Sequence, residues 1–141
     1  MRVAWVIVAL SMGVWVAPGA GQSGLDRAAG ELARAWGAGD SEAVAAAMAT
    51  GGVGLHLGGE AHTLLSVRQA RAALGEFLEA RAAGELRTVR VVELGGTPPE
   101  GFAELRWETV VRGTSQPVVH TVFVGYTQLG GGWWISEIRV L

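Results

Sequence analysis

The chain has 141 residues, 50% of them hydrophobic, with eleven basic residues against thirteen acidic ones and a formal net charge of −2 at pH 7. The length is that of one domain, and the mild acidity argues against nucleic-acid binding, which needs clustered basic side chains. Cysteine is absent, so a hydrophobic core and not disulfides must hold the fold.

The first 21 residues are typical of a secretory signal peptide. Arg2 precedes an apolar run over residues 3–16, and small residues such as Ala17 and Gly19 follow it. The run is shorter than the roughly 20 apolar residues of a membrane-spanning helix, so we favour a cleaved signal over a retained anchor. We therefore expect a periplasmic or secreted protein that does not stay in a membrane, with a single domain over residues 22–141.

Two helices are predicted at the start of this domain. Residues 25–36 place apolar side chains at three- and four-residue steps, and Gly37 ends the segment. Asp40 is a good N-cap for a second, short helix over residues 41–50.

A hairpin is predicted next, because Gly58 and Gly59 lie between two short apolar strands and both positions of a tight turn need positive φ. A two-residue turn places His56 and His62 on opposite faces of this hairpin, whereas a three-residue loop sets them opposite each other. Even in the second case a third ligand is missing, so we expect no metal site.

A third helix is predicted after the hairpin. Ser66 and Gln69 have the spacing of a capping box, and the helix should run to about Ala83, where Gly84 ends it. Its buried stripe consists of apolar residues at helical spacing, namely Val67, Ala70, Leu74, Phe77 and Leu78.

From residue 86 onward the hydrophobic period changes to two. Four strands are predicted, over residues 86–94, 102–112, 118–128 and 133–141, with glycine and proline between them. Strands that follow helices in this segregated order indicate an α+β domain ending in an antiparallel meander.

The central hairpin of the meander sorts its side chains onto two faces. A turn at Thr114 and Ser115 pairs Trp107 with Val122 on an inner, apolar face. His120 shares that face and is one of its few polar groups.

The last strand contains two adjacent tryptophans, Trp133 and Trp134, and its apolar residues change phase midway. An extra residue near Ser136 and Glu137 would restore one buried face, because a β-bulge shifts the phase by one. We therefore predict a bulge, with Trp133 facing inward and Trp134 outward.

The order of these elements, with the local strings at residues 39–43, 66–78 and 132–140, resembles the NTF2-like (nuclear transport factor 2, SnoaL-like) superfamily and, within it, the small bacterial exported DUF4783 family. The resemblance implies a cone, in which a strongly curved antiparallel sheet wraps around a long helix with two further N-terminal helices. It also implies a pocket at the open end and, often, a homodimer. Some relatives are isomerases, dehydratases or cyclases that use Asp, His or Tyr, but the only aspartates here, Asp26 and Asp40, lie at helix starts.

No catalytic or cofactor motif is present: the chain has no lysine for a P-loop, and the glycines near residue 52 lack dinucleotide-binding spacing. We expect no cofactor and a non-catalytic module that binds a small, mostly apolar molecule. The predicted pocket lining is Trp36, Leu74, Phe77, Trp107, His120, Tyr126 and Trp133.

Two alternatives to this binding function stay open. One is an isomerase or dehydratase in which His120 is the base and Tyr126 polarises a carbonyl or hydroxyl group. The other is a structural or interaction domain whose cone is filled by its own side chains.

The outer sheet face is a predicted partner surface. Phe123 and Trp134 lie on it beside a row of charges, Glu104, Arg106 and Glu108, which suits a symmetric homodimer. In a monomer, arginine stems would cover these aromatic rings instead.

Overall fold

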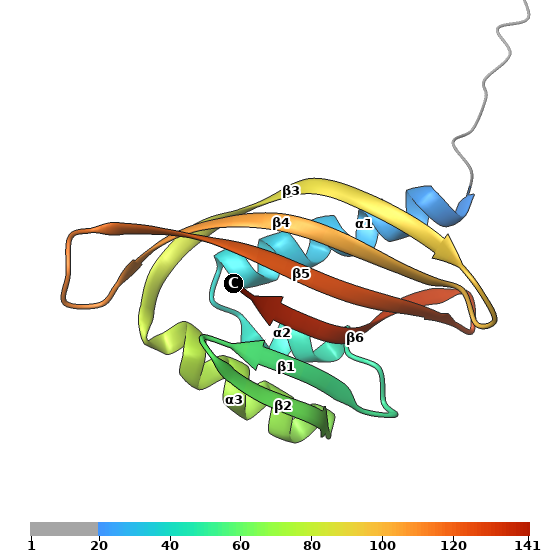
Figure 1. Cartoon of the computed structure of the whole chain (residues 1–141), viewed down its shortest axis with the longest axis horizontal. Coiled ribbons are helices and arrows are strands. Elements are labelled where there is room, and N and C mark those ends of the chain that lie inside the picture. Colours follow the sequence, from blue (N-terminus) through green and yellow to red (C-terminus); the bar gives the residue numbers. More distant parts are fainter. Residues whose placement is uncertain (1–19) are drawn as a thin grey trace, which may run out of the picture.

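The computed structural model describes residues 20–141, which form three helices and six strands (Figure 1). The predicted signal peptide, residues 1–21, lies outside this part except for its last two residues. No helix in the described residues is long and apolar enough to cross a membrane. In chain order the elements are α1 (Ala20–Gly37), α2 (Ser41–Ala46), β1 (Val53–Leu57), β2 (Glu60–Leu65), α3 (Val67–Glu79), β3 (Arg81–Gly95), β4 (Glu100–Val111), β5 (Pro117–Leu129) and β6 (Gly132–Val140).

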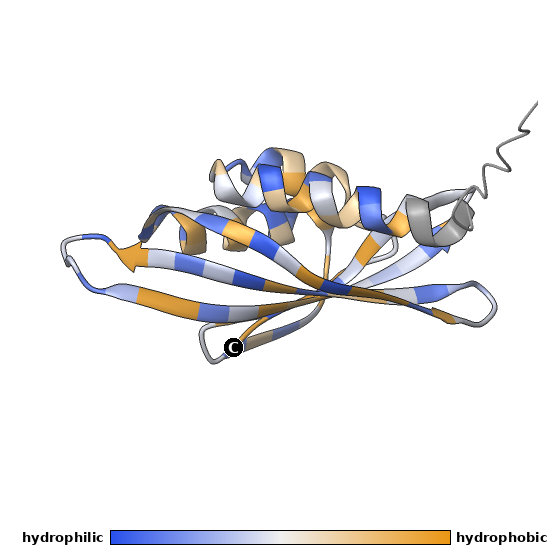
Figure 2. Ribbon diagram, turned by 90° about the horizontal axis from the view of Figure 1, so that it is seen from above, coloured by the Kyte–Doolittle hydropathy of each residue, from blue (hydrophilic) through white to orange (hydrophobic). Residues whose placement is uncertain are grey.

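All six strands form one strongly curled sheet in the order β2-β1-β6-β5-β4-β3. The predicted antiparallel meander from β3 to β6 is confirmed. One pairing differs from the expected antiparallel sheet, because β1 lies parallel to β6, with Leu55 opposite Ile138. A parallel pair needs a long crossover, and α3 with the four strands β2, β3, β4 and β5 supplies it. Figure 2 shows the helices on a single face of the sheet, which is therefore the inner face.

The hairpin between β1 and β2 has the predicted two-residue turn. Gly58 and Gly59 both have positive φ, at 60° and 93°, a conformation that L side chains rarely adopt. Leu57 is therefore paired with Glu60 across the turn.

The predicted starts of α2 and α3 are confirmed, but their predicted ends are not. Helix α1 begins at Ala20, five residues before the predicted start. Asp40 caps α2 and the Ser66–Gln69 capping box opens α3. Helix α2 stops at Ala46, short of residue 50, because the chain then bonds to β6 through Ala49 N–H and the Ile135 carbonyl at 2.8 Å.

The sequence predicted that Gly84 ends the third helix, and this prediction is wrong. Helix α3 ends at Glu79, and Gly84 lies inside β3 at an irregularity in its pairing with β4. A Cβ atom at Gly84 would lie only 1.9 Å from the Glu108 carbonyl oxygen. Only glycine lets the two backbones approach this closely.

The β4–β5 register differs by two residues from the predicted one. Trp107 is paired with His120, and Leu105 with Val122. The loop is longer than two residues, because Gly113 adopts a φ of 84° and the Thr114 N–H bonds to the Val111 carbonyl. A shift of two residues leaves every side chain on its predicted face.

The predicted bulge in β6 is confirmed at Ser136. Tyr126 is opposite Ile135, but the preceding Gly125 is opposite Glu137, so Ser136 is the extra residue. The phase change lets the apolar residues on both sides of the bulge share the buried face, namely Ile135, Ile138 and Val140.

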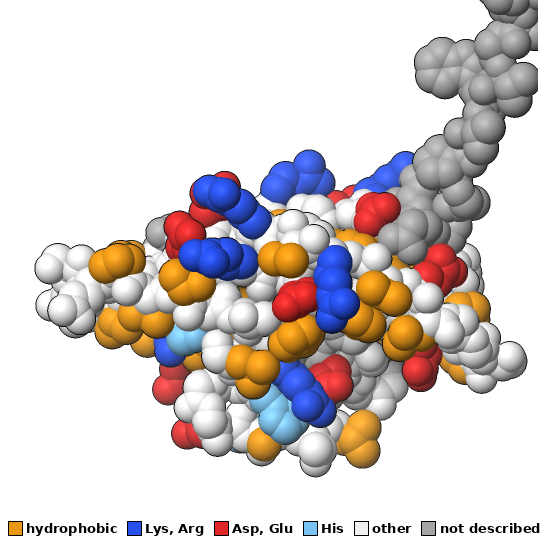
Figure 3. Space-filling model, turned by 45° about the horizontal axis from the view of Figure 1, so that its top comes forward, with side chains coloured by type: hydrophobic (Ala, Val, Ile, Leu, Met, Phe, Trp, Pro, Cys, Tyr) orange, Lys and Arg blue, Asp and Glu red, His pale blue; other side chains and the backbone are white. Residues whose placement is uncertain are grey.

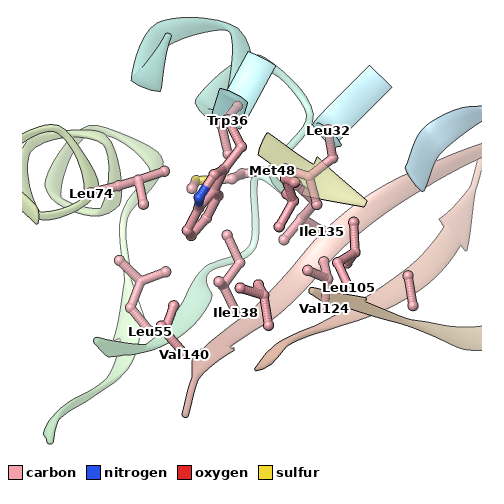
Figure 4. Close-up of a cluster of buried hydrophobic side chains, with 14 of the residues drawn as sticks. Leu32, Trp36, Met48, Leu55, Leu74, Leu105, Val124, Ile135, Ile138 and Val140 are labelled. Carbon is pink, nitrogen blue, oxygen red and sulfur yellow. The ribbon is translucent and has the colours of Figure 1, made fainter. Parts of the chain in front are cut away.

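The core fills the concave side of the sheet. In Figure 4, Trp36 of α1 and Leu74 of α3 point toward the strand side chains Leu55 and Ile138. All four side chains are at most 1% exposed, and burial of each stabilises the fold by about 1.5–3 kcal/mol. The curled sheet and its helices are therefore joined by one continuous core.

Candidate functional site

The seven predicted pocket residues do not surround one cavity. Four of them, Trp36, Leu74, Trp107 and Tyr126, are at most 2% exposed, while Phe77, His120 and Trp133 are partly exposed. Apart from Leu74, which lies in the core on α3, they fall into two groups along the inner face of the sheet. We call these groups the Trp107 end, which holds Trp36, Phe77, Trp107 and His120, and the Tyr126 end, which holds Tyr126 and Trp133.

Trp107 is the centre of an aromatic cluster at its end of the sheet. Its ring centroid lies 5.4 Å from that of Trp36 in an edge-to-face arrangement, 5.8 Å from Phe77 and 5.4 Å from His120. Such pairs add about 0.5–1.5 kcal/mol each beyond their burial. The cluster therefore forms an aromatic wall that joins α1, α3, β4 and β5.

The Tyr126 end is packed differently. A Cβ atom at Gly24 of α1 would lie 3.4 Å from the Trp133 indole, so helix and ring are in close contact. The Tyr126 hydroxyl is buried without a hydrogen-bond partner among residues 20–141. Burial raises the pKa of Tyr126 above its usual range, and the negative charge of Glu31 raises it further.

His120 and Tyr126 are not brought together. Both lie on β5, and six residues of extended strand span about 20 Å. The His120 Nδ1 atom is 3.2 Å from the Leu141 carbonyl oxygen, to which a protonated Nδ1 donates. One small substrate cannot contact both side chains at once, which argues against the paired acid–base mechanism.

Two neighbouring hollows open at the Trp107 end. The first, which we call the inner cavity, has a volume of about 170 Å³ and is lined by Trp36, Leu78, Arg81, Ala82, Trp107 and Arg112, among others. The second, the hairpin cleft, has a volume of about 600 Å³ between the β1–β2 hairpin and α3, and its lining includes Leu57, His62, Ala73, Phe77 and Arg81. Arg81 lines both hollows and so stands between them.

Arg81 is held in place by its surroundings. Its guanidinium carbon lies 3.8 Å from the centroid of the Phe77 ring and 5.9 Å from that of Trp107. Its Nη1 donates to the Phe77 carbonyl oxygen at 3.1 Å. Burial lowers the pKa of Arg81, although a guanidinium stays charged at neutral pH.

Three hydrogen-bond donors around the inner cavity lack an acceptor. Within the described part of the chain, Trp36 Nε1, Trp107 Nε1 and Arg81 Nε are all buried and make no hydrogen bond. An unpaired buried donor costs about 1–3 kcal/mol. Natural structures leave few buried donors without a hydrogen-bond partner. Three unpaired donors on residues that line one cavity therefore indicate a site for a hydrogen-bond acceptor.

Arg81 was missed by the sequence analysis, which placed it inside the third helix. The signal that could have found it is local: Arg81 follows Phe77 by four residues at the end of an apolar stripe. That spacing lets a cation stack on a ring when the helix ends between them.

Metal ligands are sparse in residues 20–141, where no group of three or more His, Cys, Asp or Glu side chains gathers. His62 Nε2 lies 3.7 Å from a Glu60 oxygen, and His56 Nε2 lies 3.9 Å from a Glu137 oxygen. The two pairs occupy opposite faces of the hairpin and cannot combine.

The outer sheet face carries apolar rings among paired charges. A groove of about 320 Å³ is lined by residues that include Phe102, Phe123, Glu137 and Arg139. Ion pairs lie on the same outer face, such as Arg90 with Glu104 at 2.8 Å and Arg106 with Glu108 at 3.3 Å. Figure 3 shows hydrophobic side chains between basic and acidic ones on the face that it presents.

No family model and no curated protein matches the sequence. Solved structures do match. A DUF4783 family protein from Bacteroides uniformis superposes with a TM-score of 0.66 at 15% identity, over 79% of this chain and 93% of that one. An NTF-2 like protein of unknown function from Shewanella oneidensis gives a TM-score of 0.62 at 14% identity, over 84% and 96%.

A third match is a hypothetical protein with a ketosteroid isomerase-like fold from Catenulispora acidiphila, in complex with trimethylamine. Its TM-score is 0.63 at 13% identity, over 81% of this chain and 83% of that one. Identities this low establish the fold alone. The chain therefore adopts the NTF2-like cone fold, with DUF4783 structures among its structural neighbours.

Proposed function

We propose that this chain is a non-catalytic module that binds a small, mostly apolar molecule at the Trp107 end of its cone. The observation that carries the proposal is the pair of hollows that meet at Arg81, beside the Trp36–Trp107–Phe77 aromatic cluster. Ligand sites combine apolar and aromatic walls with a few convergent polar groups, and this region has both.

The size of the two hollows supports the same function. Ligand pockets commonly measure about 300–1,000 Å³, so the inner cavity of about 170 Å³ is small by itself. The adjoining hairpin cleft of about 600 Å³ brings the region into that range. A ligand would lie along Phe77 and Arg81, with one end near the indoles.

The structural neighbours support a binding role and no particular chemistry. The neighbour with a ketosteroid isomerase-like fold is in complex with trimethylamine, a small organic molecule. Fold likeness alone does not carry catalysis over, and His120 and Tyr126 are about 20 Å apart on one strand. The burial of Leu74 and Tyr126, at 0% and 2% exposed, supports the alternative of a cone filled by its own side chains.

A thermal-shift screen of lipophilic compounds tests this function with two matched variants. Ala72 is exposed and lines the hairpin cleft, so Ala72→Trp should fill the cleft. Ala61 is exposed on the opposite face of β2, so Ala61→Trp is the control. We expect at least one compound to raise the Tm of the wild type and of Ala61→Trp but not of Ala72→Trp.

The contrary outcome of the screen is clear. If no compound raises the Tm, and native mass spectrometry finds nothing bound after gentle purification, the binding function is wrong. The filled-cone alternative then stands.

We also propose that the outer sheet face forms a symmetric homodimer. Phe123 and Trp134 supply apolar rings, and Arg106 can meet a glutamate of a second copy across a two-fold axis. Light scattering tests this: the wild type should have the mass of two chains at micromolar concentration, and Trp134→Glu should have the mass of one. A wild-type mass near one chain would overturn the dimer.

Export is the third part of the proposal. It rests on the apolar, small-residue start of the sequence. Mass spectrometry of the exported protein should find its first residue between Ala20 and Gly24. An intact Met1 on membrane-bound protein would contradict it.

A further inference from the structure

Three side-chain donors around the inner cavity are buried and unpaired, whereas several donors of the same types elsewhere in residues 20–141 have partners. The Trp134 indole donates to the Leu129 carbonyl oxygen at 3.1 Å. Arg87, Arg90 and Arg106 each pair with a glutamate. By contrast, Trp36 Nε1, Trp107 Nε1 and Arg81 Nε have no acceptor in residues 20–141.

The two indoles are nearly inaccessible to solvent, with Trp36 at 1% and Trp107 at 2% exposed. Bulk water therefore does not satisfy their N–H groups. Both residues line the inner cavity, and Figure 4 shows the Trp36 nitrogen on the ring edge that is turned toward α3 and Leu74. An indole N–H donates a hydrogen bond and accepts none, so a group that binds at these indoles must supply an acceptor.

The charge at the cavity points to an anion. Arg81 and Arg112 line it, against a single carboxylate from Glu79, and Arg81 has no ion pair within the described residues. The stacking on Phe77 and the bond from Nη1 to the Phe77 carbonyl hold the guanidinium in one orientation. A fixed, partly desolvated guanidinium binds a planar acid group better than a mobile surface arginine does.

We infer that the inner cavity is a carboxylate subsite, in which Arg81 and the indole N–H groups of Trp36 and Trp107 bind the acid group of a small organic acid. The inference rests on the proposed binding function and names the class of its ligand. The volume of about 170 Å³ suits a carboxylate with a short carbon chain, since one water occupies about 30 Å³ of liquid. The rest of an apolar acid lies past Arg81 in the hairpin cleft.

A monocarboxylate fits these walls better than phosphate does. Leu78 and Ala82 supply apolar surface, and only one of the two arginines is held by stacking. A phosphate dianion loses more hydration on entering such a site than a carboxylate with a single charge. Inorganic phosphate is therefore a separate probe in the test.

The experiment compares three probes of equal chain length: hexanoate, hexan-1-ol and hexylamine. Isothermal titration calorimetry should find hexanoate bound at least about tenfold more tightly than the other two. In ¹H–¹⁵N spectra, hexanoate should move the indole N–H signals of Trp36 and Trp107, identified by their loss in Trp36→Phe and Trp107→Phe. The Trp134 signal, already bonded to a carbonyl, should stay in place.

Matched arginine variants locate the charge. Arg81→Gln should weaken hexanoate binding by about tenfold or more and leave hexan-1-ol binding unchanged. Arg87→Gln is the control, because Arg87 is exposed on the outer face and paired with Glu85 at 3.0 Å. This variant should change neither hexanoate binding nor hexan-1-ol binding. Should Arg81→Gln fail to fold, the indole shifts in the wild type still test the inference.

The outcomes separate this inference from the proposed function. Equal binding of hexanoate and hexan-1-ol, or unmoved indole signals, overturns the carboxylate subsite and leaves the apolar binding function standing. Tighter binding of inorganic phosphate than of hexanoate overturns it as well. If none of the three probes binds at millimolar concentration while compounds from the thermal-shift screen do, the carboxylate subsite is wrong and the apolar binding function stands. If the thermal-shift screen also finds no ligand, the subsite and the binding function are both wrong.

Discussion

The two ends of the inner sheet surface each bury polar atoms without partners, and the surroundings give those atoms different meanings. At the Tyr126 end, one hydroxyl is buried in a packed core, and Tyr126 borders none of the hollows described above. At the Trp107 end, the unpaired donors belong to residues that line a cavity with a stacked arginine. An unmet hydrogen bond in a closed core only destabilises the fold, whereas the same group beside a cavity can bind a ligand.

The largest expected effect comes from breaking the wall at the Trp107 end. Trp107→Ala removes the ring that contacts Trp36, Phe77 and His120, so we expect a loss of about 3–5 kcal/mol in the free energy of unfolding. Urea denaturation measures it. Val119→Ala on the exposed face of β5 is the control and should change stability by no more than about 0.5 kcal/mol.

A second change tests the backbone beside the cavity. Gly84→Ala should cost about 1–3 kcal/mol, because its Cβ would lie 1.9 Å from the Glu108 carbonyl oxygen and the strands must separate. Gly30→Ala is the opposite case, since nothing lies within 4 Å of its added Cβ on α1, and it should stabilise by up to about 1 kcal/mol. Equal stability of the two variants would show that β3 and β4 are not in close contact at Gly84.

Alkaline titration sharpens the comparison from the Tyr126 end. Burial, followed by the charge of Glu31, raises the pKa of Tyr126 in the folded state, whereas the unfolded phenol titrates near about pH 10. The Tyr126 hydroxyl therefore stays protonated to a higher pH in the folded state than in the unfolded state. The stability that this pKa difference contributes is complete below about pH 10 and is lost as the pH rises from there through the folded-state pKa.

Tyr126 is the only tyrosine in the chain, so tyrosinate absorbance reports this group alone. We expect little tyrosinate in the folded protein at about pH 11 and full ionisation after unfolding in urea. Glu31→Gln should move the folded transition to lower pH. A folded protein that ionises at the unfolded pKa would show that the hydroxyl is exposed to water.

The smallest effect belongs to the Tyr126 hydroxyl itself. Tyr126→Phe removes a buried group that has no partner in the described residues, so stability should be unchanged or rise by up to about 1 kcal/mol. Chemical denaturation of wild type and variant decides this. A loss above about 1 kcal/mol would indicate that the hydroxyl bonds to an ordered internal water.

Much of the fold could be predicted from local sequence. The glycine pair at residues 58–59, the Ser66–Gln69 capping box and the β6 bulge at Ser136 were all recognisable, because each depends on a few neighbouring residues. The faces of β4 and β5 were also correct, although the register was not. Side-chain alternation determines the face, whereas the exact loop conformation around Gly113 determines the register.

The sequence by itself thus determined the number and order of the helices and strands and which side of the sheet is apolar. The tertiary structure alone decided where α3 ends, that β1 runs parallel to β6, and that Trp36, Arg81 and Trp107 meet at one cavity. Periodicity and turn chemistry act over a few residues, but these three side chains come from α1, β3 and β4. Their meeting depends on how the curled sheet closes over the helices, and no local pattern encodes that closure.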